Sequence, residues 1–493
     1  MEYASRGSTI KHAASAPDTP LPPWYMPLSS PGAGCDFGDE FVPAFNEATV
    51  HDPSIFRAGA DFYVIGSHMA MATSRDLVKW TQISNFVNAA HPFIDANDFA
   101  EAFAWSQSRT FWAGDIEPMP DGRFFLYYCN CQGSMPLGNI GLAISDGPAA
   151  PYRNQGIFLK SGMAGESHGG TRYDATVHPN CIDPHAFFDA VGDFWMVYGS
   201  FSGGIFILRM CPKTGLPLPG QGYGKKLCGG NHARIEGPYI LYSPESGYYY
   251  LFLSFGGLGT EEGYNIRVAR SRHVDGPYVD ARGNDIIAAK GAPGSVFDDA
   301  SIAPYGTKLM GGYWFMQERG EPGRNTTGHL SPGHNSAYYD ASSGRYFLIF
   351  HQRFAHSRTI HRVRVHEMWL TGEGWFVVSP FRYEGAAGAH RPFEAAHMQG
   401  TWKLIPHGQS INYSCELSIA TNFNEDGTIQ GRHAAGKWAL DADGATVRII
   451  LNEVTYTGRV LRCYNADVER WVMAFTAICA EGTALWGAGL AEV

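Results

Sequence analysis

The sequence predicts an all-β protein, and three of its features support this prediction. Glycine accounts for 59 of 493 residues, well above the usual share of ~7%. Aromatic residues make up 14% of the chain, whereas charged residues make up only 17%. Five glycine turns also recur, each followed by a short run of aromatic and β-branched residues. These features indicate many tight turns between short strands, and the 44% hydrophobic content provides for a large core.

The repeat predicts a five-bladed β-propeller over residues 40–390. Successive glycines lie 55 to 97 residues apart, and each interval has room for about four short strands, the content of one propeller blade. A β-sandwich is the alternative, but five aromatic hairpins in one frame favour the propeller. The five segments are 59–65 (GADFYVI), 122–128 (GRFFLYY), 192–198 (GDFWMVY), 247–253 (GYYYLFL) and 344–350 (GRYFLIF).

A polar residue precedes each of these glycines by 7 to 11 positions. If each blade runs strand, glycine turn, strand, the five polar residues occupy equivalent positions. The first strand of a propeller blade lines the central channel, so we expect these side chains to converge at one mouth of the channel. The residues are Asp52, Asp115, Asp183, Glu236 and His334. Asp52 and Asp183 each precede a proline, which predicts an extended backbone at both aspartates.

Both ends of the chain differ in character from the repeat. Residues 1–39 are expected to be an N-terminal extension. Residues 396–493 contain short strands broken at Asp426-Gly427 and Asp443-Gly444, and they predict a small C-terminal β-barrel. Four tryptophans lie at even intervals within it, and we expect them in the barrel core rather than on a sugar-stacking surface. They are Trp402, Trp438, Trp471 and Trp486.

Composition limits the partners and the compartment. The formal net charge is −10 and no long run of Lys or Arg occurs, so we expect no nucleic-acid partner. No stretch approaches ~18 uninterrupted apolar residues, and no membrane span is expected. Residues 1–20 lack the pattern of a secretory signal. The protein is therefore either intracellular or extracellular with its signal removed, and we expect the second. The nine scattered cysteines are expected to be buried free thiols.

Three carboxylates at the predicted channel mouth point to glycoside hydrolysis. Asp52, Asp183 and Glu236 come from three different blades. Cleavage needs a carboxylic acid that protonates the leaving oxygen and a carboxylate that activates water or attacks the sugar. A third carboxylate can raise the pKa of the acid by repulsion. Serine-hydrolase chemistry has less support, because no helix follows the serines of 199–203 (GSFSG) as a nucleophile elbow requires.

Six short strings carry these residues: 51–55 (HDPSI), 111–115 (FWAGD), 181–185 (CIDPH), 198–206 (YGSFSGGIF), 234–240 (RIEGPYI) and 333–336 (GHNS). They resemble glycoside hydrolase family 43, and within it most of all the two-domain endo-α-1,5-L-arabinanases. The resemblance covers both the propeller and the barrel. It implies an endo-acting, inverting hydrolase of α-1,5-linked L-arabinan that works as a monomer on arabinan or arabino-oligosaccharides.

The resemblance also implies roles for individual residues. Asp52 is expected to be the general base, Glu236 the general acid, and Asp183 the group that tunes and orients the acid. One hydrated calcium ion is expected in the channel, contacted by His334; the alternative is a hydrogen-bonded histidine without metal. The expected substrate-binding residues are Trp112 and Phe201, which would stack on sugar rings, together with Asp115, Asn180 and Ser202.

Two other functions stay open at this point. The first is an enzyme of the same fold with another specificity, either an exo-acting arabinofuranosidase or a β-xylosidase. Endo and exo action differ in whether loops block one end of the cleft, which the sequence does not reveal. The second is a non-catalytic carbohydrate-binding propeller, which the presence of all three carboxylates disfavours.

Overall fold

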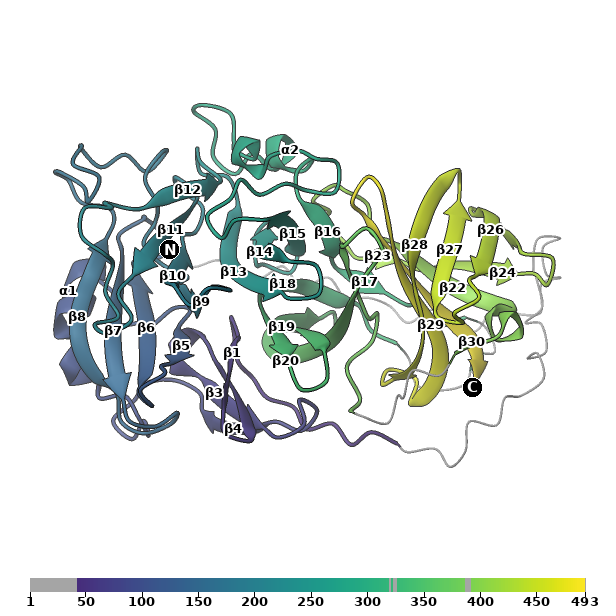
Figure 1. Cartoon of the computed structure of the whole chain (residues 1–493), viewed down its shortest axis with the longest axis horizontal. Coiled ribbons are helices and arrows are strands. Elements are labelled where there is room, and N and C mark those ends of the chain that lie inside the picture. Colours follow the sequence, from purple (N-terminus) through teal and green to yellow (C-terminus); the bar gives the residue numbers. More distant parts are fainter. Residues whose placement is uncertain (1–41, 319–320, 322–325, 386–391, 493) are drawn as a thin grey trace, which may run out of the picture.

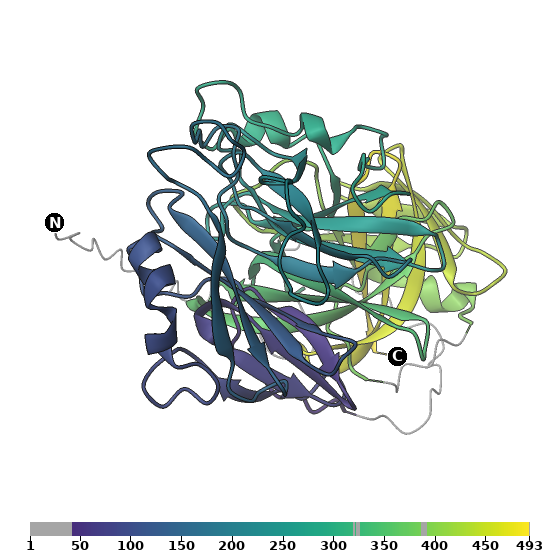
Figure 2. The same cartoon turned by 60° about the vertical axis from the view of Figure 1, so that its left-hand side comes forward.

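The computed structural model describes residues 42–318, 321, 326–385 and 392–492, and strands dominate these residues. Five β-sheets form a ring, and a closed eight-stranded barrel lies beside it (Figure 1, Figure 2). The predicted all-β fold, a five-bladed propeller with a C-terminal β-barrel, is confirmed. The predicted N-terminal extension, residues 1–39, lies outside the described residues. The predicted domain bounds, 40–390 and 396–493, stay predictions.

Each of the first four blades is a four-stranded antiparallel sheet whose strands follow one another along the chain. Blade 1 contains β1 (Ser54–Ala58), β2 (Asp61–Ile65), β3 (Met71–Ser74) and β4 (Thr81–Ser84). Blade 2 contains β5 (Asp115–Pro118), β6 (Phe124–Cys131), β7 (Gly138–Ser145) and β8 (Arg153–Lys160). Blade 3 contains β9 (His185–Phe188), β10 (Phe194–Tyr198), β11 (Ile205–Met210) and β12 (Lys225–Cys228). Blade 4 contains β13 (Ile235–Ser243), β14 (Tyr248–Phe255), β15 (Asn265–Ser271) and β16 (Thr307–Met310).

Blade 5 is a larger sheet that includes one strand from beyond the start of the barrel. Its main strands are β18 (His329–Asp340), β19 (Arg345–Phe354), β20 (Ser357–Leu370) and β21 (Phe376–Val378). The short β17 (Tyr313–Trp314) extends the sheet and pairs in parallel with β23 (Glu416–Leu417). The short helices lie in connections: α1 (Ala100–Ser106), α2 (Asp299–Ile302), and the 3₁₀ turns η1 (Ser67–Met69), η2 (Ala96–Phe99), η3 (Ile286–Ala288) and η4 (Ala395–Met398).

The repeated glycines lie where the sequence places them, between the first and second strands of each blade. All five have a positive φ, between 62° and 89°, a conformation that glycine adopts without a steric penalty. The aromatic run after each glycine forms the second strand, and its side chains supply buried core residues. In every blade, therefore, the glycine turn and the buried aromatic strand that follows it occur together, as the sequence predicts.

Among the residues that the structure describes, no strand is shared between the first and last blades of the propeller. The innermost strands β1, β5, β9, β13 and β18 contact one another in this order, and β18 also contacts β1. Side chains and the segment before β1 make the closure. Ser336 Oγ donates to Pro53 O (2.7 Å) and accepts from the Ile55 amide (3.1 Å). Glu47 pairs with Arg364 and with Arg382, each at 2.7 Å.

The barrel contains β22 (Gly400–Pro406), β24 (Ile419–Phe423), β25 (Thr428–Gly431), β26 (Ala435–Leu440), β27 (Thr446–Leu451), β28 (Val454–Asn465), β29 (Arg470–Cys479) and β30 (Ala484–Glu492). Its four tryptophans are at most 7% exposed, which confirms them as core residues. Trp486 packs in one cluster with residues of blades 4 and 5. The two domains thus share apolar core.

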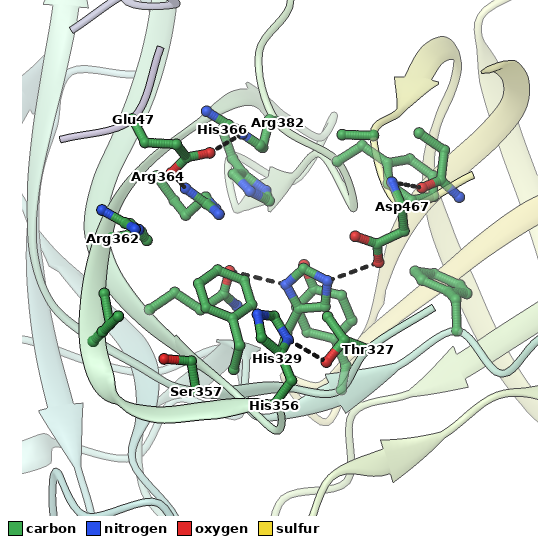
Figure 3. A pocket seen from close by; sticks show the side chains of 18 residues that line it. Glu47, Thr327, His329, His356, Ser357, Arg362, Arg364, His366, Arg382 and Asp467 are labelled. Carbon is green, nitrogen blue, oxygen red and sulfur yellow. Dashed lines mark hydrogen bonds and ion pairs between the residues drawn. The ribbon is translucent and has the colours of Figure 1, made fainter. Parts of the chain in front are cut away.

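Polar contacts also hold the barrel against the propeller. Lys308 of blade 4 is buried, and its Nζ donates to Gly408 O (2.7 Å) and Ser410 O (2.8 Å). Arg267 reaches Gln409 O from the same blade (2.6 Å). A pocket of about 480 Å³ lies at the junction (Figure 3), where His329 of β18 pairs with Asp467 of the barrel. The segment that follows β22 is thereby held against the propeller.

Eight cysteines lie in the part of the chain that the structure describes; all are free and six are buried. The predicted buried thiols are therefore confirmed for most of them. Among the described residues, no helix has the length and apolar character needed to cross a bilayer.

Candidate active site

One mouth of the central channel brings together four of the predicted site residues. Asp52, Asp183 and His334 each lie two positions before an inner-strand residue at the same level of the ring. Gly237 is their equivalent in blade 4, so Glu236 stands one residue earlier than its predicted position. All four side chains are at most 14% exposed.

The structure corrects the predicted place of Asp115. This residue pairs with Tyr127 at the level of Ser54 and His185, two residues deeper in the channel than Asp52. It is 2% exposed, and its two carboxylate oxygens accept from Ser54 Oγ (2.5 Å) and from the Ala186 amide (2.8 Å). Asp115 therefore joins three blades below the mouth. Its predicted role in substrate binding stays a prediction.

The backbone at the two aspartates is also not extended as predicted. φ is +56° at Asp52 and +55° at Asp183, and Gly237 and His334 have φ of +57° and +41°. A short polar side chain makes this region accessible to aspartate, and the contacts at the mouth override the preference that the following proline imposes. Residues held in sparsely populated conformations cluster at functional sites.

Asp52 is surrounded by groups that favour its ionised form. Burial alone would raise its pKa, but His51 and His334 hold the pKa well below its ordinary value. His334 Nδ1 lies 3.2 Å from Asp52 Oδ1, and Ser67 Oγ donates to Oδ2 at 2.5 Å. The Asp52 amide donates to His351 Nδ1 (3.1 Å). Asp52 is thus an ionised carboxylate fixed on every side.

Glu236 and Asp183 have the opposite tendency. Burial raises the pKa of both carboxyl groups, and neighbouring carboxylates raise them further. Glu236 is held by two donors, Ser200 Oγ to Oε2 (2.8 Å) and Tyr264 OH to Oε1 (2.9 Å). Asp183 Oδ2 accepts from the Gly237 amide (3.3 Å). One site therefore contains a carboxylate whose pKa is lowered and two carboxyl groups whose pKa values are raised, the division that acid–base catalysis requires.

His334 balances the negative charge of this group. Burial lowers the pKa of its imidazole, but Asp52, Asp183 and Glu236 outweigh burial and raise the pKa to about 10. Gly237 lies against the ring, and a Cβ at this position would come within 3.1 Å of His334 Cγ. The close histidine and the positive φ of +57° both favour glycine at the position that follows Glu236.

The remaining predicted residues surround the mouth at different depths. Phe201 is half-buried, and its amide donates to Ile235 O (2.9 Å), beside Glu236. Asn180 and Ser202 are buried, and Asn180 Oδ1 accepts from Ser161 (3.1 Å). Trp112 is partly buried against the core shared by blades 2 and 3. Their roles in substrate binding stay predictions.

Several residues of the site were not predicted from the sequence. Ser200 and Tyr264 bind Glu236, and Ser67, His51 and His351 contact Asp52. His351 directly follows the fifth repeat segment, so the repeat offered a signal for it. Tyr264 has no such signal, because its contact with Glu236 depends on how β15 packs.

Comparison with known proteins identifies the family. The model for glycosyl hydrolases family 43 matches residues 45–376. The chain belongs to glycosyl hydrolase family 43. A second model, for a C-terminal lipocalin-like domain, matches residues 380–487, the region of the barrel.

Individual family members match nearly the whole chain. An extracellular endo-α-(1→5)-L-arabinanase 2 of Bacillus subtilis is 50% identical over 90% of this chain and 94% of its own length. The corresponding Thermotoga petrophila enzyme is 41% identical over 91% and 95%. A crystal structure of a family 43 glycoside hydrolase from Bacillus licheniformis superimposes with a TM-score of 0.88 at 49% identity, covering 91% of this chain and all of that one.

The buried carboxylates make the free energy of unfolding depend on pH. Because the pKa of Asp183 is raised on folding, its ionisation destabilises the protein as pH rises from the unfolded-state value through the folded-state value. We expect Asp183→Asn to raise the melting temperature, with a gain larger at pH 8 than at pH 5. Thermal unfolding in a buffer that contains a chelator measures both. The exposed Asp146→Asn is the control. A gain that stays constant with pH would contradict this account of Asp183.

Proposed function

We propose that this protein is an endo-acting α-1,5-L-arabinanase that inverts the configuration of the anomeric carbon. The observation that carries the proposal is that ionised Asp52 and buried Glu236 lie at one channel mouth. It is supported by 50% identity to an endo-arabinanase over 90% of this chain and 94% of that one. Arabinan and arabino-oligosaccharides are the proposed substrates of a monomer. Both close relatives are named as extracellular enzymes, which supports the proposal that this protein is secreted.

The proposed mechanism divides the work between the two carboxyl groups. Glu236 donates its proton to the oxygen of the leaving sugar, while Asp52 takes a proton from the water that attacks the anomeric carbon from the other side. Burial and the charge of Asp52 raise the pKa of Glu236, which favours the protonated acid, and Ser200 and Tyr264 orient it. Asp183 and Glu236 repel each other electrostatically, and Asp183 is the proposed tuning group. His51, Ser67 and His334 keep Asp52 ionised and fixed.

Product analysis on linear arabinan tests the proposal. The protein should release a ladder of oligomers. Release of arabinose alone would indicate the exo-acting alternative, and no cleavage at all would indicate a non-catalytic binding module.

Glu236→Gln should reduce arabinan cleavage by roughly 10²–10⁴-fold, because a sugar is a poor leaving group that needs a proton. The same variant should keep more activity on an aryl arabinoside, whose leaving group needs little help.

Asp52→Asn should remove both activities, since water must be activated for either substrate. The exposed Glu101→Gln is the matched control and should change neither. Equal losses on both substrates for Glu236→Gln would contradict its role as the acid. Retention of activity by Asp52→Asn would contradict the role of Asp52 as the base.

We also propose that the channel holds one calcium ion. A cavity of about 20 Å³ lies among Asp52, Asp183, His185, His334 and Asn335, large enough for one water or ion. Asn335 Oδ1 and His185 Nδ1 are buried and have no hydrogen-bond partner among the described residues. Calcium prefers oxygen ligands. Asn335 Oδ1 would therefore bind the ion directly, whereas His334 would contact it through a water molecule. The ion would supply positive charge that offsets the repulsion among the carboxylates.

Replacing His334 tests this proposal. His334→Ala should lower the bound calcium and reduce turnover by about 10–100-fold, the range typical of groups that support a metal. The melting temperature should move little, because the other contacts between blades 1 and 5 remain. Metal analysis, kinetics and melting on one preparation measure all three, with the exposed His433→Ala as control. Unchanged calcium and activity would show that His334 has only a structural role.

A further inference from the structure

Three aromatic side chains lie together on the Glu236 side of the channel mouth. We call Phe201, Phe297 and Tyr413 the aromatic rim. Phe201 is tied by its amide to Ile235, the residue before Glu236. The Phe201 and Phe297 rings meet edge to face, with centroids 5.6 Å apart. The rim therefore begins directly beside the proposed acid.

Tyr413 reaches the rim from the other domain. It lies in the connection between β22 and β23, so the chain has already formed the first barrel strand when it returns to the propeller. Its hydroxyl donates to Asp299 Oδ2 at 2.8 Å. Residues 408–410, just before it, are held by Lys308 and Arg267 of blade 4. The position of Tyr413 is thus fixed by contacts on both sides.

Arg234 links the two outer rings to the strand that carries Glu236. Its guanidinium carbon lies 5.7 Å from the centroid of Phe297 and 5.9 Å from that of Tyr413. The same guanidinium pairs with Asp299 through two of its nitrogens. Since Arg234 precedes Glu236 by two residues, a shift of the rim relative to the acid would break these contacts. The rim is a preorganised surface.

Two of these rings are nevertheless exposed to solvent. Phe297 is 52% exposed and Tyr413 54% exposed. Phe297 and Phe201 also have positive φ, +59° and +50°, which is unusual for bulky residues and costs free energy that the surroundings must supply. A single exposed aromatic residue is normal for a soluble protein. Two exposed rings held against Arg234, two residues before the proposed acid, indicate a ligand with apolar faces.

We propose that the aromatic rim is a distal sugar subsite, in which Phe297 and Tyr413 pack against a pentose ring of the polymer beyond the bond that Glu236 protonates. The C–H face of a sugar ring packs on an aromatic ring, and its hydroxyl groups stay in water. The inference rests on the proposed function, since it assigns a sugar unit of that substrate to this surface. It gives the C-terminal domain a part in substrate binding through Tyr413.

The test compares long and short substrates. Tyr413→Ala should raise KM for linear arabinan about tenfold, the effect of losing one aromatic contact, and leave kcat unchanged. Kinetics on an aryl arabinoside, which is too short to reach the rim, should not change. Tyr413→Phe should restore most of the affinity because it keeps the ring. Phe297→Ala should act in the same direction as Tyr413→Ala. Phe86→Ala, which removes a 61% exposed ring in blade 1, is the matched control.

Binding measurements separate this inference from the proposed function. In the Glu236→Gln protein, which should cleave arabinan only slowly, affinity for arabino-oligosaccharides should rise by a step at the length that reaches Tyr413, and Tyr413→Ala should remove that step. If Tyr413→Ala leaves the dependence of affinity on oligosaccharide length unchanged, the proposed subsite is wrong and the proposed function stands. If the Glu236→Gln protein binds no arabino-oligosaccharide and the wild type cleaves no arabinan, the proposed function itself is wrong. Equal losses on long and short substrates would also overturn the subsite.

Discussion

The geometry of the site depends on closure of the propeller between its first and last blades. Within the described part of the chain no strand is shared across this seam, so specific contacts hold it rather than a continuous ladder. The Ser336 hydroxyl binds Pro53 and Ile55, His351 accepts from the Asp52 amide, and Glu47 pairs with two arginines of the last blade and the segment after it. The residues that close the ring therefore also fix Asp52.

Closure of the propeller determines which ionisable side chains meet at the channel mouth, and therefore their pKa values. It brings His334 of the last blade to Asp52 of the first, while Asp183 and Glu236 arrive from blades 3 and 4. Burial raises the pKa of each carboxyl group, but only Asp52 has enough cationic and hydrogen-bonding neighbours to reverse that effect. Two chemically similar groups thus acquire opposite protonation preferences because their surroundings differ.

The sequence predicts the parts of this structure that depend on local patterns. The five glycine turns place the blades, and the tryptophans of the barrel are core residues. Three carboxylates and His334 were found from their offset to those turns. The offset failed for Asp115, because a repeat does not reveal where inner-strand pairing begins. It also missed Tyr264, Phe297 and Tyr413, whose contacts with the site follow from packing between blades or between domains and leave no periodic signal.

The central claim is that Asp52 activates water while Glu236 protonates the leaving oxygen, within one direct displacement. Proton NMR of the products formed in the first turnovers on α-1,5-linked arabino-oligosaccharides tests this most directly. Direct displacement by water predicts that the newly formed reducing end appears first as the β-anomer and then equilibrates. Initial release of the α-anomer would mean two successive displacements through a covalent intermediate, and it would contradict the role assigned to Asp52.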